Sequence, residues 1–96
     1  MAYQIAYHPA VLADDLPVIN HDLQVRISRA IQERLTVDSL RYGEPLRHRL
    51  KGYWKLRVGD YRVMYHIVHH EVQILRIDHR KGIYALPPRH VRLRSS

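Results

Sequence analysis

Residues 55–81, within the segment 50–84, carry six cations, spaced so that they can hold an extended anion. They are Lys55, Arg57, Arg62, Arg76, Arg80 and Lys81. The segment reads as three strands joined by tight turns, so these charges follow a predicted sheet. Charge within a sheet needs a partner, because burying it unpaired costs free energy. The pattern therefore indicates a surface for a polyanion, and RNA phosphate fits it best.

The charge of the chain is divided unequally between its two parts. Residues 1–40 contain three arginines and five acids, a net of −2, whereas residues 41–96 contain thirteen Lys and Arg and four acids, a net of +9. Together they make the formal charge of +7 of the whole chain. The asymmetry indicates a basic face with an acidic or polyanionic partner, although a merely soluble basic protein would show the same totals.

The composition excludes several classes of protein. A chain of 96 residues, 46% apolar and 26% charged, predicts one globular core, and we assign residues 1–86 to a single domain and residues 87–96 to a basic tail. The absence of cysteine excludes disulfides and thiolate chemistry. The longest apolar run, residues 10–13, is too short to cross a membrane, so we expect a cytoplasmic protein without a membrane partner. We expect no metal or other cofactor, since His66 and His70 would lie ~13 Å apart on one strand face.

The N-terminal part predicts one strand followed by two helices. Residues 2–8 alternate in the manner of a half-buried strand. Pro9 suits the first turn of a helix that continues over residues 10–16 and stops at Pro17. Asn20 is a good N-cap for the second helix. The apolar positions that recur on one face of this second helix are Leu23, Ile27, Ala30, Ile31 and Leu35.

The C-terminal part predicts three further strands. An irregular basic connection, residues 38–52, precedes them. The strands are expected at residues 53–58, 61–68 and 71–79, with turns at Gly59-Asp60 and, less clearly, at His69-His70. In the first of these strands, Trp54, Leu56 and Val58 alternate with polar residues and are expected to face the core. The order β-α-α-β-β-β predicts an α+β domain in which a helix hairpin packs on a mainly antiparallel four-stranded sheet.

Three runs of residues are typical of a known family. They are Gly43-Glu44-Pro45-Leu46, the run LKGYWKLRVGDYRVMY at residues 50–65, and Asp78-His79-Arg80 with Tyr84. With the strand and helices before them, they closely resemble the RelE/ParE superfamily of bacterial toxins over nearly the whole chain. The resemblance implies the RelE-like microbial RNase fold.

The same resemblance implies two possible activities. The RelE branch cuts messenger RNA, typically in the ribosomal decoding site, whereas the ParE branch poisons DNA gyrase and has no nuclease activity. Both are paired with an antitoxin, and toxin and antitoxin together repress their own operon. The expected partners are therefore a cognate antitoxin, mRNA and the ribosome, with operator DNA contacted only through the antitoxin complex.

Metal-independent RNA cleavage needs a deprotonated 2′-OH, a protonated leaving oxygen and stabilised charge on the phosphate. Arginine meets the last need bidentately. The resemblance implies that Arg62 contacts the scissile phosphate, that Arg80 stabilises charge or aids the leaving group, and that Tyr84 orients or stacks on a base, a contact worth ~1–3 kcal/mol. Alternatively, Arg62 is structural and pairs with Asp60 or Asp78, and Tyr84 caps the edge of the core.

Three further residues are candidates for proton transfer. Lys55 matches one of two lysines that ribosome-dependent RelE toxins carry on this strand. The position of the second lysine is Tyr53 here, which weakens a mechanism that needs two lysines. Lys55 then acts as a base or as a phosphate contact. Glu44 resembles a glutamate of the YoeB subgroup and His79 its histidine, so that a carboxylate base and a histidine acid would flank the phosphate held by Arg62. Alternatively, Glu44 is a solvated loop acid, and His79 belongs to the His-Arg pair that ParE members also carry.

The remaining cations form a fringe suited to the RNA backbone. They are Arg47, Arg49, Lys51, Arg57 and Lys81. Such contacts make affinity fall with salt and carry no sequence information. We therefore predict a type II toxin that cleaves mRNA without metal on the ribosome. The alternatives are a gyrase inhibitor of the ParE type and a non-toxic member that only binds its antitoxin in a repressor complex.

Overall fold

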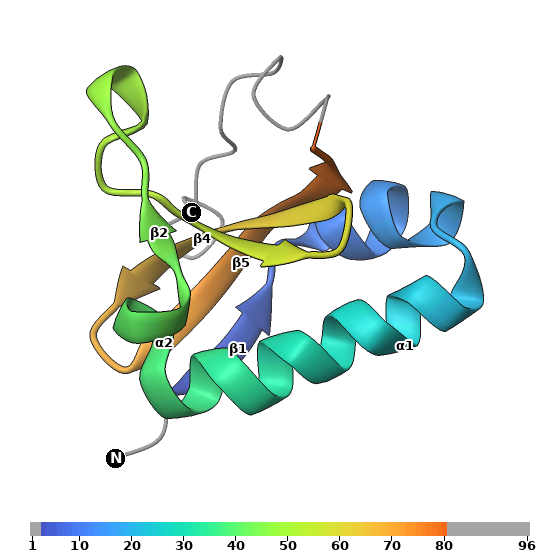
Figure 1. Ribbon diagram of the computed structural model, residues 1–96, viewed down its shortest axis with the longest axis horizontal. Helices are drawn as coiled ribbons and strands as arrows, with labels where there is room; N and C mark the ends of the chain where they lie inside the picture. Colours follow the sequence, from blue (N-terminus) through green and yellow to red (C-terminus); the bar gives the residue numbers. More distant parts are fainter. Residues whose placement is uncertain (1–2, 81–96) are drawn as a thin grey trace.

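A five-stranded sheet in the order β1-β5-β4-β3-β2 forms one layer of the molecule (Figure 1). The computed structural model describes residues 3–80. Its strands are β1 (Gln4–Tyr7), β2 (Glu44–Pro45), β3 (Trp54–Val58), β4 (Tyr61–Val68) and β5 (Glu71–His79). Its helical segments are η1 (Val11–Asp15), η2 (Leu16–Val18), α1 (His21–Ala30), η3 (Ile31–Leu35), α2 (Thr36–Tyr42) and η4 (His48–Leu50). The predicted α+β class and element order are confirmed.

The strands after the helices form antiparallel hairpins, and the first strand joins them in parallel. Gly59 takes a φ of 61° in the β3–β4 turn, and Val58 lies opposite Tyr61 as a two-residue hairpin requires. His69 takes a φ of 56° in the β4–β5 turn. β1 then pairs with β5 in parallel, from Gln4 opposite Glu71 to Tyr7 opposite Ile74. The sheet is therefore mixed.

Two predictions about these elements were wrong in detail. The sheet has a fifth strand, because Glu44 and Pro45 pair with Lys55 and Trp54 at its edge; Pro45 is tolerated there since an edge strand has one unpaired side. The first helical segment does not stop at Pro17, which lies in the 3₁₀ turn η2. A proline early in a helical turn costs little, because its missing N–H would have no partner there.

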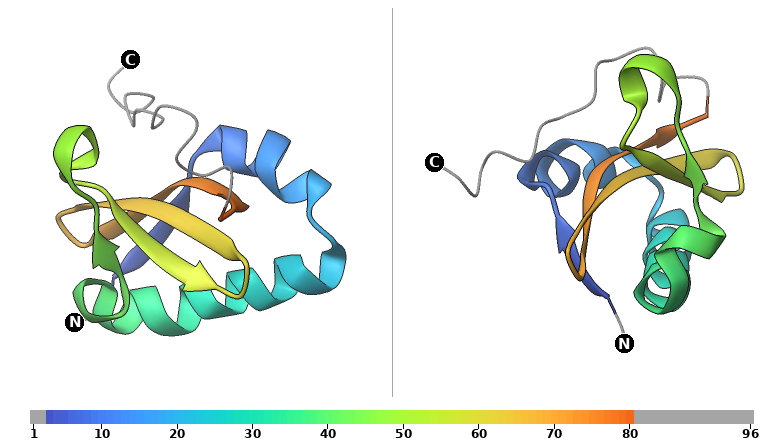
Figure 2. Two further views of the ribbon diagram at one scale, coloured as in Figure 1. Left: turned by 45° about the horizontal axis from the view of Figure 1, so that its top comes forward. Right: turned by 90° about the vertical axis from the view of Figure 1, so that its left-hand side faces the viewer.

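The continuous helix formed by α1 and η3 lies along one face of the sheet (Figure 2). Asn20 caps α1 as predicted, since its side-chain oxygen accepts a hydrogen bond from the backbone N–H of Asp22. Ile27, Ile31 and Leu35 are fully buried and belong to the hydrophobic core. The core residues contributed by the sheet are Leu56, Val58, Val63, Tyr65, Val72, Ile74 and Ile77. None of the helices within residues 3–80 combines the length and the apolar character needed to cross a bilayer.

Because side chains alternate along a strand, the residues between these core positions point to the opposite face of the sheet. On β3 and β4 these are Lys55, Arg57, Arg62 and Met64, and on β5 they include Arg76 and Asp78. We call this side the cationic face and define it by Lys55, Arg57, Arg62 and Arg76. The predicted division of β3 between core and cations is confirmed, with Leu56 and Val58 buried and Trp54 packed against the core.

A buried carboxylate accepts a hydrogen bond from a backbone amide of β5, beyond the last residue of β5 that pairs with β1. Asp15, which is 9% exposed, accepts a hydrogen bond from the backbone N–H of Ile77 at 2.9 Å. Asp15→Ala leaves this amide without its partner, so we expect the free energy of unfolding to fall by about 1–3 kcal/mol. Urea unfolding measures the loss. Asp14→Ala, at the exposed neighbouring position, should change stability by less than about 0.5 kcal/mol; equal losses in both variants would contradict this role.

Two tyrosines that pack in or against the core should make the free energy of unfolding fall at alkaline pH. Burial raises the pKa of Tyr65, and it also raises the pKa of Tyr7, where a hydrogen bond with Ser28 partly opposes the shift. Both folded-state pKa values lie above the unfolded value of about 10, so their contribution is complete below about pH 10 and is lost as the pH rises further. Tyr65→Phe should flatten the fall in urea midpoint above about pH 10. An unchanged fall in that variant would show that other groups cause it.

Candidate functional site: the cationic face

Arg62 lies in a row of charged residues that crosses three strands. It is directly opposite Arg57 on β3 and Asp78 on β5. Side chains at opposed positions have Cβ atoms about 5 Å apart. The next row on the same face runs from Glu44 through Lys55 and Met64 to Arg76, about 7 Å along the strands at 3.3 Å per residue. The sheet thus arranges the cations in two adjacent rows.

The guanidinium of Arg62 is held in place by backbone carbonyls. The residue is 8% exposed, and its Nη1 donates to the oxygens of Gly59 and Tyr61, each at 3.0 Å. Within residues 3–80 it forms no ion pair, which excludes pairing with Asp60 or Asp78. A carboxylate oxygen of Asp78 instead accepts the backbone N–H of His79 at 2.7 Å. Arg62 is therefore fixed in position while its charge is not neutralised by a described acid.

Arg80 reaches the same turn from the end of β5. Its backbone N–H donates to the oxygen of Asp60 at 2.8 Å, and its Nε lies 4.0 Å from the Asp60 carboxylate. The Arg80 side chain is 55% exposed, so this pair contributes little to stability. The Gly59-Asp60 turn thus anchors both arginines that the resemblance singles out, by a carbonyl for Arg62 and by a carboxylate for Arg80.

Glu44 and Lys55 form an ion pair across the edge of the sheet. The Lys55 Nζ lies 3.4 Å from a carboxylate oxygen of Glu44, and the two residues are opposite each other on β2 and β3. The fifth strand therefore brings two of the proton-transfer candidates together. Glu44 is more exposed than Lys55, with side-chain exposures of 58% and 24%, so its carboxylate is accessible beside the cationic face.

His79 lies on the other side of the sheet from Arg62. It is opposite Tyr61, and the two rings meet edge to face with centroids 5.7 Å apart. Tyr61 packs against the hydrophobic core on the helix-covered face. Glu44 and His79 were expected to flank the phosphate held by Arg62. In the structure, Glu44 lies beside the cationic face, whereas His79 packs on Tyr61 on the opposite side of the sheet.

The predicted RNA-binding fringe is only partly described. Arg47 and Lys51 are exposed on either side of the 3₁₀ turn η4, and Arg57 is exposed on β3. Tyr53, which replaces the second lysine of the resemblance, contacts the ring of His66 with centroids 5.7 Å apart. The side chain of Arg49, and Lys81, Tyr84 and the tail at residues 87–96, lie outside the described part of the chain.

Arg76 is a member of the face that the sequence analysis counted among the strand cations but did not name as a site residue. It is 6% exposed and lies in the row of Lys55. Strand alternation from Asp78 would have placed it on the side of Arg62. Across residues 3–80, no group of three or more His, Asp or Glu residues could hold a metal ion. The face thus offers a cluster of cations, of which Arg62 is oriented by two carbonyls, with the exposed carboxylate of Glu44 at its edge.

Comparisons with known proteins identify the family. A family model described as the ParE toxin of type II toxin–antitoxin systems matches residues 5–84. The chain belongs to the RelE/ParE toxin family. Toxin RelG of Mycobacterium tuberculosis is 44% identical over 70 residues, covering 67% of this chain and 80% of that toxin. Toxin RelE of the same organism is 34% identical over 87 residues, covering 85% and 90%. The predicted superfamily is thus confirmed.

Solved structures agree with this family fold. The toxin–antitoxin complex RelBE2 of Mycobacterium tuberculosis contains a chain that matches with a TM-score of 0.77 and 32% identity, over 83% of this chain and all of that one. The RelB–RelE complex of Methanococcus jannaschii matches with a TM-score of 0.63 and 23% identity, over 83% and 95%. The second match shows the shared fold alone.

Proposed function

We propose that this RelE/ParE family toxin is a metal-independent endoribonuclease that cleaves mRNA on the ribosome. One observation carries the proposal: Arg62 is buried on the cationic face, oriented by two carbonyls, directly opposite Arg57 and without an ion pair in residues 3–80. A fixed cation of this kind stabilises charge that develops on a phosphate, because no reorganisation is needed at the moment of reaction.

The reaction is transesterification within the RNA strand. A base takes the proton of the 2′-OH, the oxygen forms a bond to the adjacent phosphorus, and the bond from phosphorus to the 5′ oxygen breaks. The products are a 2′,3′-cyclic phosphate and a 5′-OH, which receives a proton. Arg62 and Arg57 hold the phosphate oxygens, and Arg80 stabilises the leaving side from the shared turn. Tyr84 completes the proposed site by stacking on a base.

Glu44 is the group we assign as the base. Its carboxylate can accept a proton directly, whereas a lysine ammonium must first lose its own. The ion pair with Lys55 at 3.4 Å orients the carboxylate at the row next to Arg62. Arg47, Arg49, Lys51 and Lys81 supply contacts to the RNA backbone in this proposal. His79 is left with its packing role, so the leaving oxygen takes its proton from water.

The relatives support the proposal and suggest the partner. Toxins of the RelE type are typically ribonucleases, and two relatives carry the names Toxin RelE and Toxin RelG. Related toxins have been crystallised with antitoxins, as in the RelBE2 and RelB–RelE complexes. We therefore propose a cognate antitoxin for this chain, through which operator DNA is bound. An antitoxin helix or strand laid over the cationic face would cover Arg62 and Arg80.

Mapping 5′ ends of cellular mRNA after brief induction of the toxin tests this function. We expect new 5′-OH ends within the codons of translated frames, and none after induction of Arg62→Ala. Intact mRNA during growth arrest would overturn the proposal. If new ends appeared equally in untranslated RNA, the proposed dependence on the ribosome would be wrong, whereas the proposed nuclease activity would stand.

A second candidate is inhibition of DNA gyrase. The observation that favours it is the family match over residues 5–84, whose description is that of a ParE toxin. The two activities differ in what fails first in the cell. Induction of the DNA-damage response with translation initially intact would favour gyrase inhibition, and purified toxin would then block supercoiling by gyrase.

A further inference from the structure

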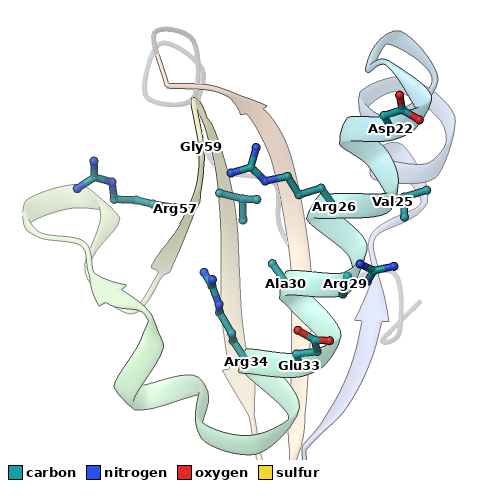
Figure 3. Close-up of a pocket in the computed structure, with 10 residues that line it drawn as sticks. Asp22, Val25, Arg26, Arg29, Ala30, Glu33, Arg34, Arg57 and Gly59 are labelled. Carbon is teal, nitrogen blue, oxygen red and sulfur yellow. The ribbon is translucent and has the colours of Figure 1, made fainter.

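A groove of about 340 Å³ lies between α1 and the end of β3 (Figure 3). Four arginines line it, together with two acids: Arg26, Arg29, Arg34, Arg57, Asp22 and Glu33. Figure 3 shows Arg26 and Arg34 extending from the helix toward β3, whereas Arg57 extends from that strand away from the helix. The groove is therefore distinct from the proposed catalytic row, although Arg57 is close to both.

Arg26 is held against the turn that anchors Arg62 and Arg80. A Cβ atom built on Gly59 would lie 3.7 Å from the Nη1 and Nη2 of Arg26. The guanidinium thus lies over a residue without a side chain, at ordinary contact distance. Arg34 follows eight residues later, ~12 Å along the helical segment at 1.5 Å per residue. Arg26 and Arg34 therefore line the groove from positions about two helical turns apart.

The arginines of the helix remain unneutralised despite acids at helical spacing. Asp22 precedes Arg26 by four residues and Glu33 follows Arg29 by four, the spacing at which ion pairs form on a helix. Within residues 3–80, however, Arg26, Arg29 and Arg34 take part in no ion pair. All three are exposed. Their charges are thus available to a ligand.

We propose that this groove binds the phosphate backbone of an RNA strand, as a second contact in addition to the cationic face. The inference rests on the proposed function, since it assumes that RNA is the ligand of this toxin. Arg26 and Arg34 can each contact one phosphate of a strand that lies along the groove. The residues that line the groove favour RNA over a protein segment. Ala30 and Val58 are buried, so Val25 is the exposed apolar residue of the lining. A protein partner would need a larger apolar centre.

Fluorescence anisotropy with a short labelled RNA tests the groove. The RNA carries 2′-O-methyl groups, which keep its phosphates and prevent cleavage. Each phosphate contact contributes about 0.7 to the slope of log affinity against log salt for single strands, so the Arg26→Gln/Arg34→Gln variant should have a slope shallower by about 1.4. Arg41→Gln is the matched control, because Arg41 is exposed on α2 and does not line the groove; its slope should equal that of the unmodified protein. Circular dichroism verifies that each variant is folded.

The outcomes separate this inference from the proposed function. RNA binding by the groove is overturned if the slope of log affinity against log salt is unchanged in the double variant. It is also overturned if Arg41→Gln reduces this slope equally. An unchanged RNA slope with weakened binding of a poly-glutamate peptide also overturns it, because the groove would then be a site for acidic protein. Loss of slope in a toxin that leaves cellular mRNA intact supports the groove and overturns the nuclease. A toxin that binds no RNA overturns both.

Discussion

Arg62→Ala is expected to reduce the rate of mRNA cleavage by about 10²–10³-fold, the loss that follows removal of one preorganised group that stabilises transition-state charge. The structure gives the reason, since the Arg62 guanidinium is oriented by the carbonyls of Gly59 and Tyr61 and has no described acid to neutralise it. Single-turnover cleavage of mRNA on programmed ribosomes measures the effect. The loss should appear in the rate at saturating toxin, because binding is shared among many cations.

Arg62→Lys is the matched variant, because it keeps the charge and loses the planar fork. We expect intermediate cleavage from it. Urea unfolding must accompany both variants, since each loses the hydrogen bonds to the Gly59-Asp60 turn. Cleavage by folded Arg62→Ala at the unmodified rate would show that the phosphate lies elsewhere.

Glu44→Gln is expected to reduce cleavage by about 10²–10⁴-fold, the usual contribution of a positioned general base. The substitution keeps the size of the side chain and removes its capacity to take the proton of the 2′-OH. Single-turnover cleavage of mRNA on programmed ribosomes measures the loss. A folded Glu44→Gln toxin that cleaves at the unmodified rate would contradict the assignment of Glu44 as the base.

Lys55→Gln separates the base from its partner. It leaves the Glu44 carboxylate in place and removes the ion pair at 3.4 Å, so its loss of rate should be smaller than that of Glu44→Gln. A loss in Lys55→Gln that equals or exceeds the loss in Glu44→Gln would assign the proton transfer to Lys55.

The elements with strong local signals could be predicted from sequence. The Gly59-Asp60 turn requires a positive φ, and Gly59 supplies it at 61°. Strand alternation then places Lys55 and Arg57 on one side and Leu56 and Val58 on the other. The cap at Asn20 and the buried stripe of α1 follow from similarly local rules.

The features that depend on pairing between distant segments were not accessible in this way. Two residues, Glu44 and Pro45, are too few for a strand pattern, so the ion pair between Glu44 and Lys55 could not be foreseen. His79 was grouped with Arg62 through the resemblance to the YoeB subgroup, although period-two alternation places it opposite Tyr61 on the helix side. The groove beside α1 likewise needs the helix and β3 to be placed in space.

The parallel pairing of β1 with β5 has a consequence for biosynthesis. These strands stand at opposite ends of the described chain, whereas β3, β4 and β5 are joined by tight turns. Closing so long a loop carries a larger entropy cost than forming a hairpin, and contacts distant in sequence slow folding. The hairpins can therefore form early, whereas the pairing of β1 with the free edge of β5 forms later. A nascent chain that still lacks β5 cannot complete the sheet, so the sheet closes only after β5 has been synthesised.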